Sequence, residues 1–180
     1  MKLKHWKIFD TFLLFGMTFL LHFLYDWFPN PFSAIFSPVN ESIWEHMKLL
    51  ASAFFLNCIL EFLVFYFLKW NYKNLFLGSF LAAFFSIPVY LLFYLPIHYL
   101  FGHFMWYAIL LLFLVFALFN YILYRFLERK EYKNGNIYAL IGFILLFTIF
   151  GYLTYRPIKI DLFFDHEDNR YSINQYVIKQ

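Results

Sequence analysis

The chain has little charge and only one cysteine. Asp, Glu, Lys and Arg make up 14% of its 180 residues, whereas 63% of the residues are hydrophobic. A soluble domain of this composition would expose much apolar surface to water and would aggregate. The single cysteine, Cys58, excludes an internal disulfide framework and a zinc site built from cysteines. The composition therefore indicates a membrane protein whose apolar exterior is covered by lipid.

Basic residues are also few, and they form no continuous stripe. The net charge is +3, and the Lys and Arg residues lie in short clusters between apolar runs. This excludes a nucleic-acid-binding protein, which would present a basic face. The basic N-terminus resembles the start of a signal peptide, but the apolar run after it is long and no A-x-A-like cleavage site follows. We interpret this run as a retained membrane helix.

Five apolar segments are long enough to cross a bilayer, which takes about 20 helical residues. The breaks between them contain turn-forming residues, as in "PNPFSAIFSP", "KWNYKN" and "ERKEYKNGN". We therefore predict an all-α integral membrane protein, with a five-helix transmembrane bundle in residues 1–155 and an extracytoplasmic tail in residues 156–180. The predicted spans are residues 9–28, 48–69, 75–96, 104–125 and 137–155.

The distribution of Lys and Arg orients this bundle. These residues precede the first span and fill the loops after the second and fourth spans, whereas the two alternate loops hold almost none. By the positive-inside rule, the N-terminus is cytoplasmic and the C-terminus is outside. The residues concerned are Lys2, Lys4, Lys7, Lys69, Lys73, Arg125, Arg129, Lys130 and Lys133.

The tail contains two strand-like runs, "IKIDLFF" and "YSINQYVI", on either side of a polar "DHEDNR" turn. We expect a β-hairpin that docks on the outer end of the bundle, because an isolated hairpin is only marginally stable. The acidic turn suits a hard cation such as Ca²⁺, but it lacks the spacing of a known calcium loop, and a solvated turn is the simpler interpretation.

Histidines and carboxylates gather on the predicted outer side. The positive-inside rule explains the shortage of Lys and Arg there, but it does not explain the histidines. Imidazoles and carboxylates together are typical of a metal site or an acid–base site. The outer residues are His22, Asp26, Glu41, Glu45, His46, His98, His103, Asp161, Asp165, His166, Glu167 and Asp168.

The spacing of four of these residues predicts a metal site. His22 and Asp26 are four residues apart at the end of the first span, so they share one helix face. His46 lies near the start of the second span, in "SPVNESIWEHMKLL". We predict that His22, Asp26 and His46 bind a divalent metal, with Zn²⁺ as the first candidate. Glu45 or Glu41 would then activate water as general base.

Helix capping offers a simpler account of part of this stretch. Ser37 with Pro38, or Asn40 with Glu41, would cap the second span. His46 and its neighbours would then belong to an ordinary hydrogen-bonded cluster. His98 and His103 could complete a metal site from across the bundle or could simply be interfacial histidines at helix ends.

Glu61 and Asn57 are polar residues inside the second span. A carboxylate facing lipid near mid-membrane is costly, so Glu61 should face the interior of the bundle. It would serve either in a proton or ion pathway or as a structural carboxyl hydrogen-bonded to Asn57 or to another helix. The five tryptophans lie near predicted membrane boundaries and indicate an aromatic belt. Gly78 and Ala82 begin a small-residue face that suits close helix packing.

The stretches "HFLYDWFPNPF" and "SPVNESIWEHMKLL" resemble an uncharacterised family of small multi-span membrane proteins of Firmicutes-type bacteria, with N-E-S-x-W-E-H as the core motif. This resemblance implies no activity. A fainter similarity connects the chain to alkaline-ceramidase-like membrane hydrolases, which place Asp, Ser and His around zinc. Those proteins have seven spans and an H-x-x-x-H pair that this chain lacks.

Three functions are compatible with these patterns. The first is a metal-dependent membrane hydrolase acting on a lipid-linked or small-molecule substrate at the outer face of the cell membrane. The second is a small-solute or ion binding and transport protein that uses Asn57 and Glu61. The third is a non-catalytic accessory subunit of a membrane assembly.

Overall fold

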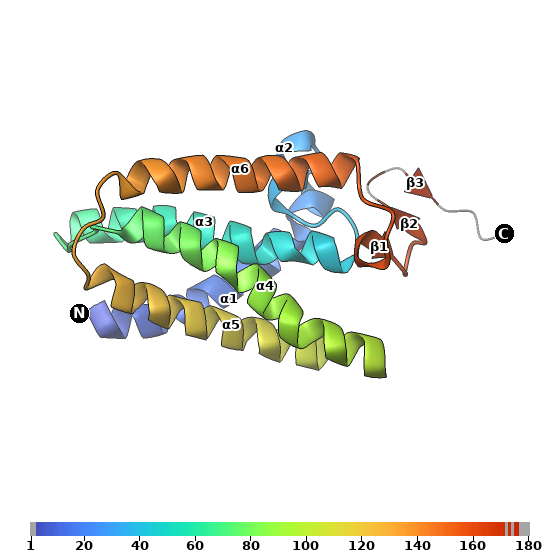
Figure 1. Ribbon diagram of the computed structural model, residues 1–180, viewed down its shortest axis with the longest axis horizontal. Helices are drawn as coiled ribbons and strands as arrows, with labels where there is room; N and C mark the ends of the chain where they lie inside the picture. Colours follow the sequence, from blue (N-terminus) through green and yellow to red (C-terminus); the bar gives the residue numbers. More distant parts are fainter. Residues whose placement is uncertain (1–2, 172, 174, 177–180) are drawn as a thin grey trace.

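Five long helices form the body of the protein. In the computed structural model, which describes residues 3–171, 173, 175 and 176, each of these helices is long and apolar enough to cross a membrane. This confirms the predicted all-α, five-helix membrane bundle. A sixth, short helix lies in the first connection (Figure 1). The helices are α1 (Leu3–Trp27), α2 (Pro31–Phe36), α3 (Ile43–Phe67), α4 (Leu75–Phe101), α5 (Met105–Leu127) and α6 (Gly135–Tyr155).

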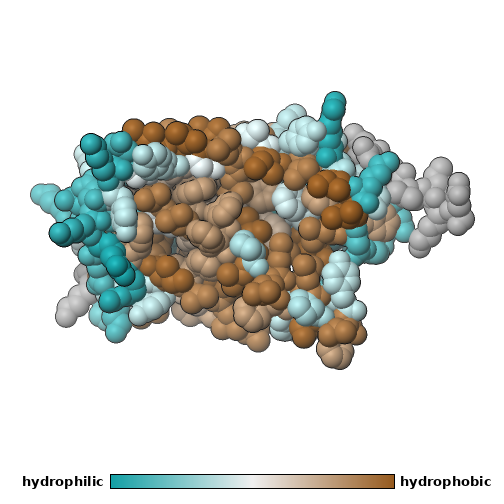
Figure 2. Space-filling view, viewed as in Figure 1, coloured by the Kyte–Doolittle hydropathy of each residue, from teal (hydrophilic) through white to brown (hydrophobic). Residues whose placement is uncertain are grey.

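Helix α3 lies at the centre of the bundle, where it packs against α1 and α4. Helix α4 also packs against α5 and α6, and α1 packs against α5. In the space-filling view, an apolar band covers the middle of the molecule and polar residues collect at its two ends (Figure 2). This distribution suits a bundle embedded in a bilayer. We call the end that carries α2 and the C-terminal tail the outer end, and the opposite end the inner end.

The small-residue face of α4 allows a close approach to α5. A Cβ atom added at Gly78 would lie only 2.5 Å from Cδ1 of Leu123. Ala82, Ala83 and Ser86 continue this face and are buried. The structure thus confirms the close helix packing predicted from these residues.

Asparagines shape both turns at the inner end. Asn74 precedes α4 and Asn134 precedes α6, and both adopt left-handed backbone conformations with φ of 62° and 59°. Asparagine tolerates this conformation better than most residues. The side chain of Asn74 also links the two turns, because it donates to the Lys130 carbonyl at 3.0 Å and accepts from the Tyr132 amide at 2.9 Å. Hydrogen bonds from one side chain to the backbone therefore join the two turns at the inner end.

The connection from α1 to α3 differs from the capping predictions. Ser42 is the N-cap of α3, and Ser37 instead ends α2. The predictions with Ser37 or Asn40 as the cap were wrong because α2 occupies the connection and delays the start of α3. The Ser37 hydroxyl donates to the Leu21 carbonyl at 2.6 Å, so it fastens the connection to α1.

The tail forms the predicted hairpin on the outer end. Strands β1 (Phe164–Asp165) and β2 (Arg170–Tyr171) pair antiparallel around the acidic turn, and β3 (Gln175–Tyr176) pairs with β2. Most of the first predicted run is not strand, and Asp161–Phe163 forms a 3₁₀ turn. Phe163 stacks on Trp44 of α3 with ring centroids 4.7 Å apart, which docks the tail. Residues 172, 174, 177 and 178 of the second run, like Lys2, lie outside the described residues.

Candidate metal centre

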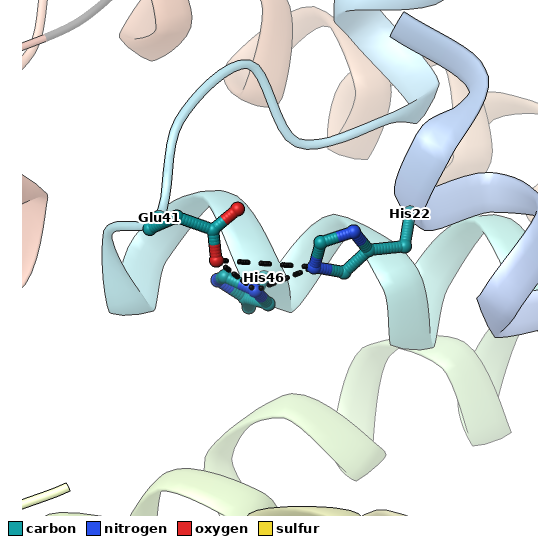
Figure 3. A group of neighbouring side chains, drawn as sticks. All are labelled: His22, Glu41 and His46. Atoms are coloured by element: carbon teal, nitrogen blue, oxygen red, sulfur yellow. Dashed lines mark hydrogen bonds and ion pairs between the residues drawn. The ribbon is translucent and has the colours of Figure 1, made fainter. Parts of the chain in front are cut away.

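Three side chains converge at the outer end, and we call them the outer cluster: His22, Glu41 and His46 (Figure 3). His22 comes from the last turns of α1, Glu41 directly precedes the cap of α3, and His46 lies in the first turn of α3. The two Nε2 atoms of the histidines are 3.2 Å apart. Oε2 of Glu41 lies 3.3 Å from Nε2 of His46 and 3.9 Å from Nε2 of His22.

These separations are close to those that a tetrahedral metal ion imposes. Zn²⁺ binds nitrogen and oxygen donors at about 2.0–2.2 Å, which places the donors of a tetrahedral site about 3.3 Å apart. Two of the three distances in the outer cluster match this spacing. The third is longer, and a small movement of one side chain would bring it into range. Two imidazoles and one carboxylate are also a donor set that zinc enzymes use. The outer cluster therefore offers three donor atoms at separations that a zinc ion could bridge.

The ring of His46 is oriented by the backbone. Its Nδ1 lies 2.9 Å from the carbonyl oxygen of Ser42, which can only accept a hydrogen bond, so Nδ1 carries a proton. Nε2 is thereby left to face His22 and Glu41. Metal-binding histidines commonly donate their other ring N–H to a backbone carbonyl in this way. Nδ1 of His22 has no hydrogen-bond partner among the described residues.

Glu41 is held in place by the tail. Its backbone N–H donates to Oδ2 of Asp165, a buried residue of β1, at 3.1 Å. A hydrogen bond from His46 lowers the pKa of Glu41 below its ordinary value, and this effect outweighs partial burial. A metal ion at Nε2 of His46 would displace the proton that forms this bond. Glu41 is therefore an ionised oxygen donor at neutral pH.

Water can reach the outer cluster. The two histidine side chains are 29% exposed and the Glu41 side chain is 43% exposed. Structural zinc sites are usually closed by four protein ligands, whereas catalytic sites keep a position for water or substrate. The exposure and the number of donors both correspond to the open kind.

The structure separates Asp26 and Glu45 from this group. Asp26 contributes no donor to the outer cluster, because His22 turns its Nε2 toward α3 and Asp26 lies one turn further along α1. Glu45 is buried and forms an ion pair with Lys48, with 2.5 Å between Oε2 and Nζ. It also accepts hydrogen bonds from the Val39 amide at 3.0 Å and from the Thr154 hydroxyl at 3.0 Å. This carboxylate is therefore engaged in structural contacts.

Residues 1–173 match a family of unknown function, DUF6512. The chain belongs to this family. No curated protein and no solved structure matches the chain. The family membership agrees with the resemblance to an uncharacterised family seen in the sequence, and it extends over the bundle and the hairpin. It assigns no activity, so the function of the protein must be argued from its side chains.

The remaining histidines of the outer end have other partners. The Tyr94 hydroxyl lies 2.9 Å from Nδ1 of His103 and 3.4 Å from Nδ1 of His98. His166 pairs with Asp161 at 2.7 Å. Among the described residues, none of these histidines joins the three converging donors.

The acidic turn of the tail is stabilised by its own hydrogen bonds. Oδ1 of Asp165 accepts from the backbone amides of Glu167 at 2.8 Å and Asp168 at 3.1 Å. Arg170 pairs with Asp168 at 2.8 Å. The oxygens of Asp165 and Asp168 are therefore engaged within the turn and with the Glu41 amide, which agrees with the simpler interpretation made from the sequence.

A second polar group lies inside the bundle, and we call it the inner cluster: Lys7, Asp10, Asn57, Glu61 and Asn120. As predicted, Glu61 faces the bundle interior, and its side chain is fully buried. Its carboxylate pairs with the Lys7 ammonium at 2.6 Å. Glu61 lies in the last two turns of α3 and Lys7 in the second turn of α1, so the pair is nearer to one end of these helices than to their middle. The inner cluster is thus near the inner end.

Sequence reasoning assigned Lys7 and Trp6 to other roles. Lys7 was counted among the topological charges ahead of the first span, but it lies within α1 and is only 5% exposed. Trp6 was assigned to the aromatic belt, but it is 7% exposed and its Nε1 donates to Glu61 at 2.9 Å. Trp27 and Trp106 are exposed, as the belt requires. The sequence signal for the inner cluster was the spacing of Lys7 and Asp10, which are three residues apart and therefore lie on the same helix face.

Proposed function

We propose that the protein is a multi-pass protein of the cell membrane that binds a divalent transition metal, Zn²⁺ foremost, at His22, Glu41 and His46. We further propose that the bound metal supports hydrolysis of a substrate at the outer membrane surface. The observation that carries the proposal is the convergence of three donor atoms at separations of 3.2, 3.3 and 3.9 Å. Without a metal ion, Nε2 of His46 donates a hydrogen bond to Glu41, and a bound metal would replace that proton.

The chemistry follows from the open position. A zinc ion with three protein ligands lowers the pKa of a bound water to about 7 and supplies a nucleophile at neutral pH. Glu41 would bind through Oε2, and its other oxygen would remain free to accept a proton from that water. Glu45 is not available for this step, because its carboxylate is paired with Lys48. Glu41 is thus the proposed base.

The surroundings of the outer cluster favour a substrate held at the membrane surface. Phe23 contacts the ring of His22 and is 45% exposed, and Trp27, which stacks on Phe23, is 56% exposed. Exposed aromatic side chains at the end of a span lie at the level of the lipid headgroups. A substrate with a lipid tail would reach the outer cluster from this layer.

Transport through Asn57 and Glu61 receives less support. Such a pathway needs these side chains to face a hydrated cavity. Both are almost completely buried, and they are engaged with Asp10 and Lys7. An accessory role would not require converging metal donors.

Metal titration of the purified protein tests the proposed site. Competition with a chromogenic chelator should give one Zn²⁺ per wild-type chain, and His46→Ala should weaken binding by at least about 100-fold. His98→Ala is the matched control, because His98 lies at the same end and contacts Tyr94. It should bind zinc like the wild type. A wild type that binds no zinc, or a His46→Ala variant that binds it equally well, would contradict the proposal.

The hydrolytic step requires its own assay. Protein in vesicles of phosphatidylethanolamine and phosphatidylglycerol is incubated with and without zinc, and the lipids are examined by mass spectrometry. Zinc-dependent cleavage products that disappear in Glu41→Gln would support the proposal. Identical lipid profiles in all samples would contradict hydrolysis of these glycerolipids.

A further inference from the structure

The inner cluster contains two carboxyl groups but only one ammonium group. Asp10 and Glu61 are fully buried, and Lys7 is 5% exposed. Among the described residues, Lys7 on α1 and Glu61 on α3 are the charged groups that face Asp10, and α5 contributes the neutral Asn120. Two ionised carboxylates would leave one negative charge without a partner in a low-dielectric interior. Such a charge is expensive, and a buried group normally neutralises instead.

The hydrogen bonds of Lys7 show which carboxylate it neutralises. Its Nζ lies 2.6 Å from the Glu61 carboxylate and 3.0 Å from Oδ1 of Asn120. The distance to Oδ2 of Asp10 is 3.4 Å, the longest of the three. Trp6 also donates to Glu61, at 2.9 Å, so both oxygens of Glu61 have strong donors. The ion pair is therefore between Lys7 and Glu61.

Asp10 is paired with an amide instead. Nδ2 of Asn57 donates to Oδ2 of Asp10 at 3.1 Å. Oδ1 of Asp10 and Oδ1 of Asn57 are both buried and have no hydrogen-bond partner among the described residues. Two buried acceptors without donors, on side chains already joined by one hydrogen bond, are a costly arrangement.

One proton would satisfy both atoms. A carboxylic acid and a primary amide form a cyclic pair in which the amide N–H donates to the acid carbonyl and the acid O–H donates to the amide oxygen. The first of these bonds is present between Asn57 and Asp10. A proton on Oδ1 of Asp10 would complete the second and would leave Oδ2 as a neutral acceptor for Lys7.

We propose that Asp10 is a proton-binding site, occupied at neutral pH, in which the protonated carboxyl and Asn57 form a cyclic acid–amide pair. The inner cluster then holds a single ion pair, Lys7 with Glu61, and has no net charge. A proton fits better than a sodium ion, because Na⁺ needs several oxygen donors and Asp10 and Asn57 offer two. The nearby Lys7 ammonium would also repel a metal cation bound at Asp10.

Paired amide substitutions test this inference. Cys58 is the single cysteine and is 3% exposed, so its reaction with a fluorogenic maleimide reports thermal unfolding. Asp10→Asn replaces the acid by an amide that can make the same two bonds to Asn57, and Tm should change by less than about 2 °C. Glu61→Gln removes the partner of Lys7 and should lower Tm by about 6 °C or more, or prevent folding. Equal losses in the two variants, or a failure of Asp10→Asn to fold, would overturn the inference.

Infrared spectroscopy provides a second measurement that does not depend on stability. The wild type at neutral pH should show the carbonyl stretch of a protonated carboxyl group, and the band should be missing from Asp10→Asn. Absence of the band from the wild type would overturn the inference. A sodium site is a separate outcome, because exchange of KCl for NaCl would then raise the Tm of the wild type but not of Asp10→Asn. That result would also overturn it.

Discussion

The outer cluster and the inner cluster each contain a glutamate carboxylate, but the groups around it differ. In the outer cluster, two imidazole nitrogens and a carboxylate oxygen face one another on a partly exposed surface. In the inner cluster, an ammonium and an indole N–H face a carboxylate inside the bundle. In the outer cluster, Nε2 of His46 donates a hydrogen bond to Glu41, and a metal ion could replace that proton. In the inner cluster, the Lys7 and Trp6 donors already satisfy the carboxylate of Glu61. We therefore propose metal binding for the outer cluster and a structural ion pair, Lys7 with Glu61, for the inner cluster.

The two clusters also differ in how deeply their carboxylates are buried. Glu61 is fully buried, whereas the Glu41 side chain is 43% exposed. A buried ion pair is difficult to open, because separating it leaves an uncompensated charge. An exposed carboxylate can exchange its partner for a metal ion or a substrate. If this comparison is right, substitutions in one cluster should leave the property of the other intact.

The largest effect is expected from breaking the inner ion pair. Glu61→Leu leaves Lys7 buried without its partner and should lower the free energy of unfolding by about 3–5 kcal/mol. The double variant Lys7→Met with Glu61→Leu should recover most of this loss, because no buried charge remains. Reversible denaturant unfolding in detergent micelles measures both values. Purely additive losses in the double variant would break the comparison, as would a loss of zinc affinity in folded Glu61→Leu.

A second buried ion pair, Glu45 with Lys48, lies beside the outer cluster. Substitutions there test whether stability and metal binding can be changed separately. Glu45→Gln leaves Lys48 without its charge partner and should cost about 3 kcal/mol of stability. Because Glu45 is outside the outer cluster, zinc affinity should stay within about threefold of the wild type. Glu41→Gln is the matched variant, and it should show the reverse: little change in stability and a large loss of zinc affinity. Unfolding and chelator competition on both variants give the four values. If folded Glu45→Gln lost its zinc, Glu45 would have to be counted among the residues of the metal site.

The smallest effect is expected from the support that the tail gives to Glu41. Asp165→Ala removes the acceptor of the Glu41 amide and should weaken zinc binding by about 10-fold, in the range seen for residues that hold metal ligands in place. His166→Ala is the control, since His166 is 63% exposed and contacts Asp161 instead. Chelator competition measures both affinities. Equal affinities in the two variants would show that the hairpin does not support the outer cluster.

The fold could be predicted almost entirely from the sequence. Five apolar runs and the alternation of basic loops specify the spans, because the bilayer imposes their length and orientation. The start of α3 was missed because "PNPFSAIFSP" contains turn residues that also cap a helix. In α2, Asn30 accepts from the Phe32 and Ser33 amides and Pro31 is the first residue. Local propensity alone does not show whether such residues form a turn or begin a short helix.

The outer cluster could be predicted only in part. His22 and His46 stood out because the positive-inside rule leaves no reason for histidines outside, and Glu41 was named as one of two bases. Asp26 was chosen as a ligand from helical spacing, which does not tell in which direction a neighbouring helix lies. The inner cluster was less visible. The positive-inside rule already accounts for a lysine near the N-terminus. The sequence therefore contained no sign that Lys7 pairs with Glu61, 54 positions away.

X-ray absorption spectroscopy at the zinc edge tests the central claim, a metal held by His22, Glu41 and His46, most directly. Purified protein loaded with one equivalent of Zn²⁺ should show four nitrogen or oxygen neighbours at about 2.0–2.1 Å, with the outer-shell scattering of two imidazole rings. His46→Ala should lose one imidazole contribution. A spectrum of fully hydrated, six-coordinate zinc, or one unchanged by His46→Ala, would contradict the account.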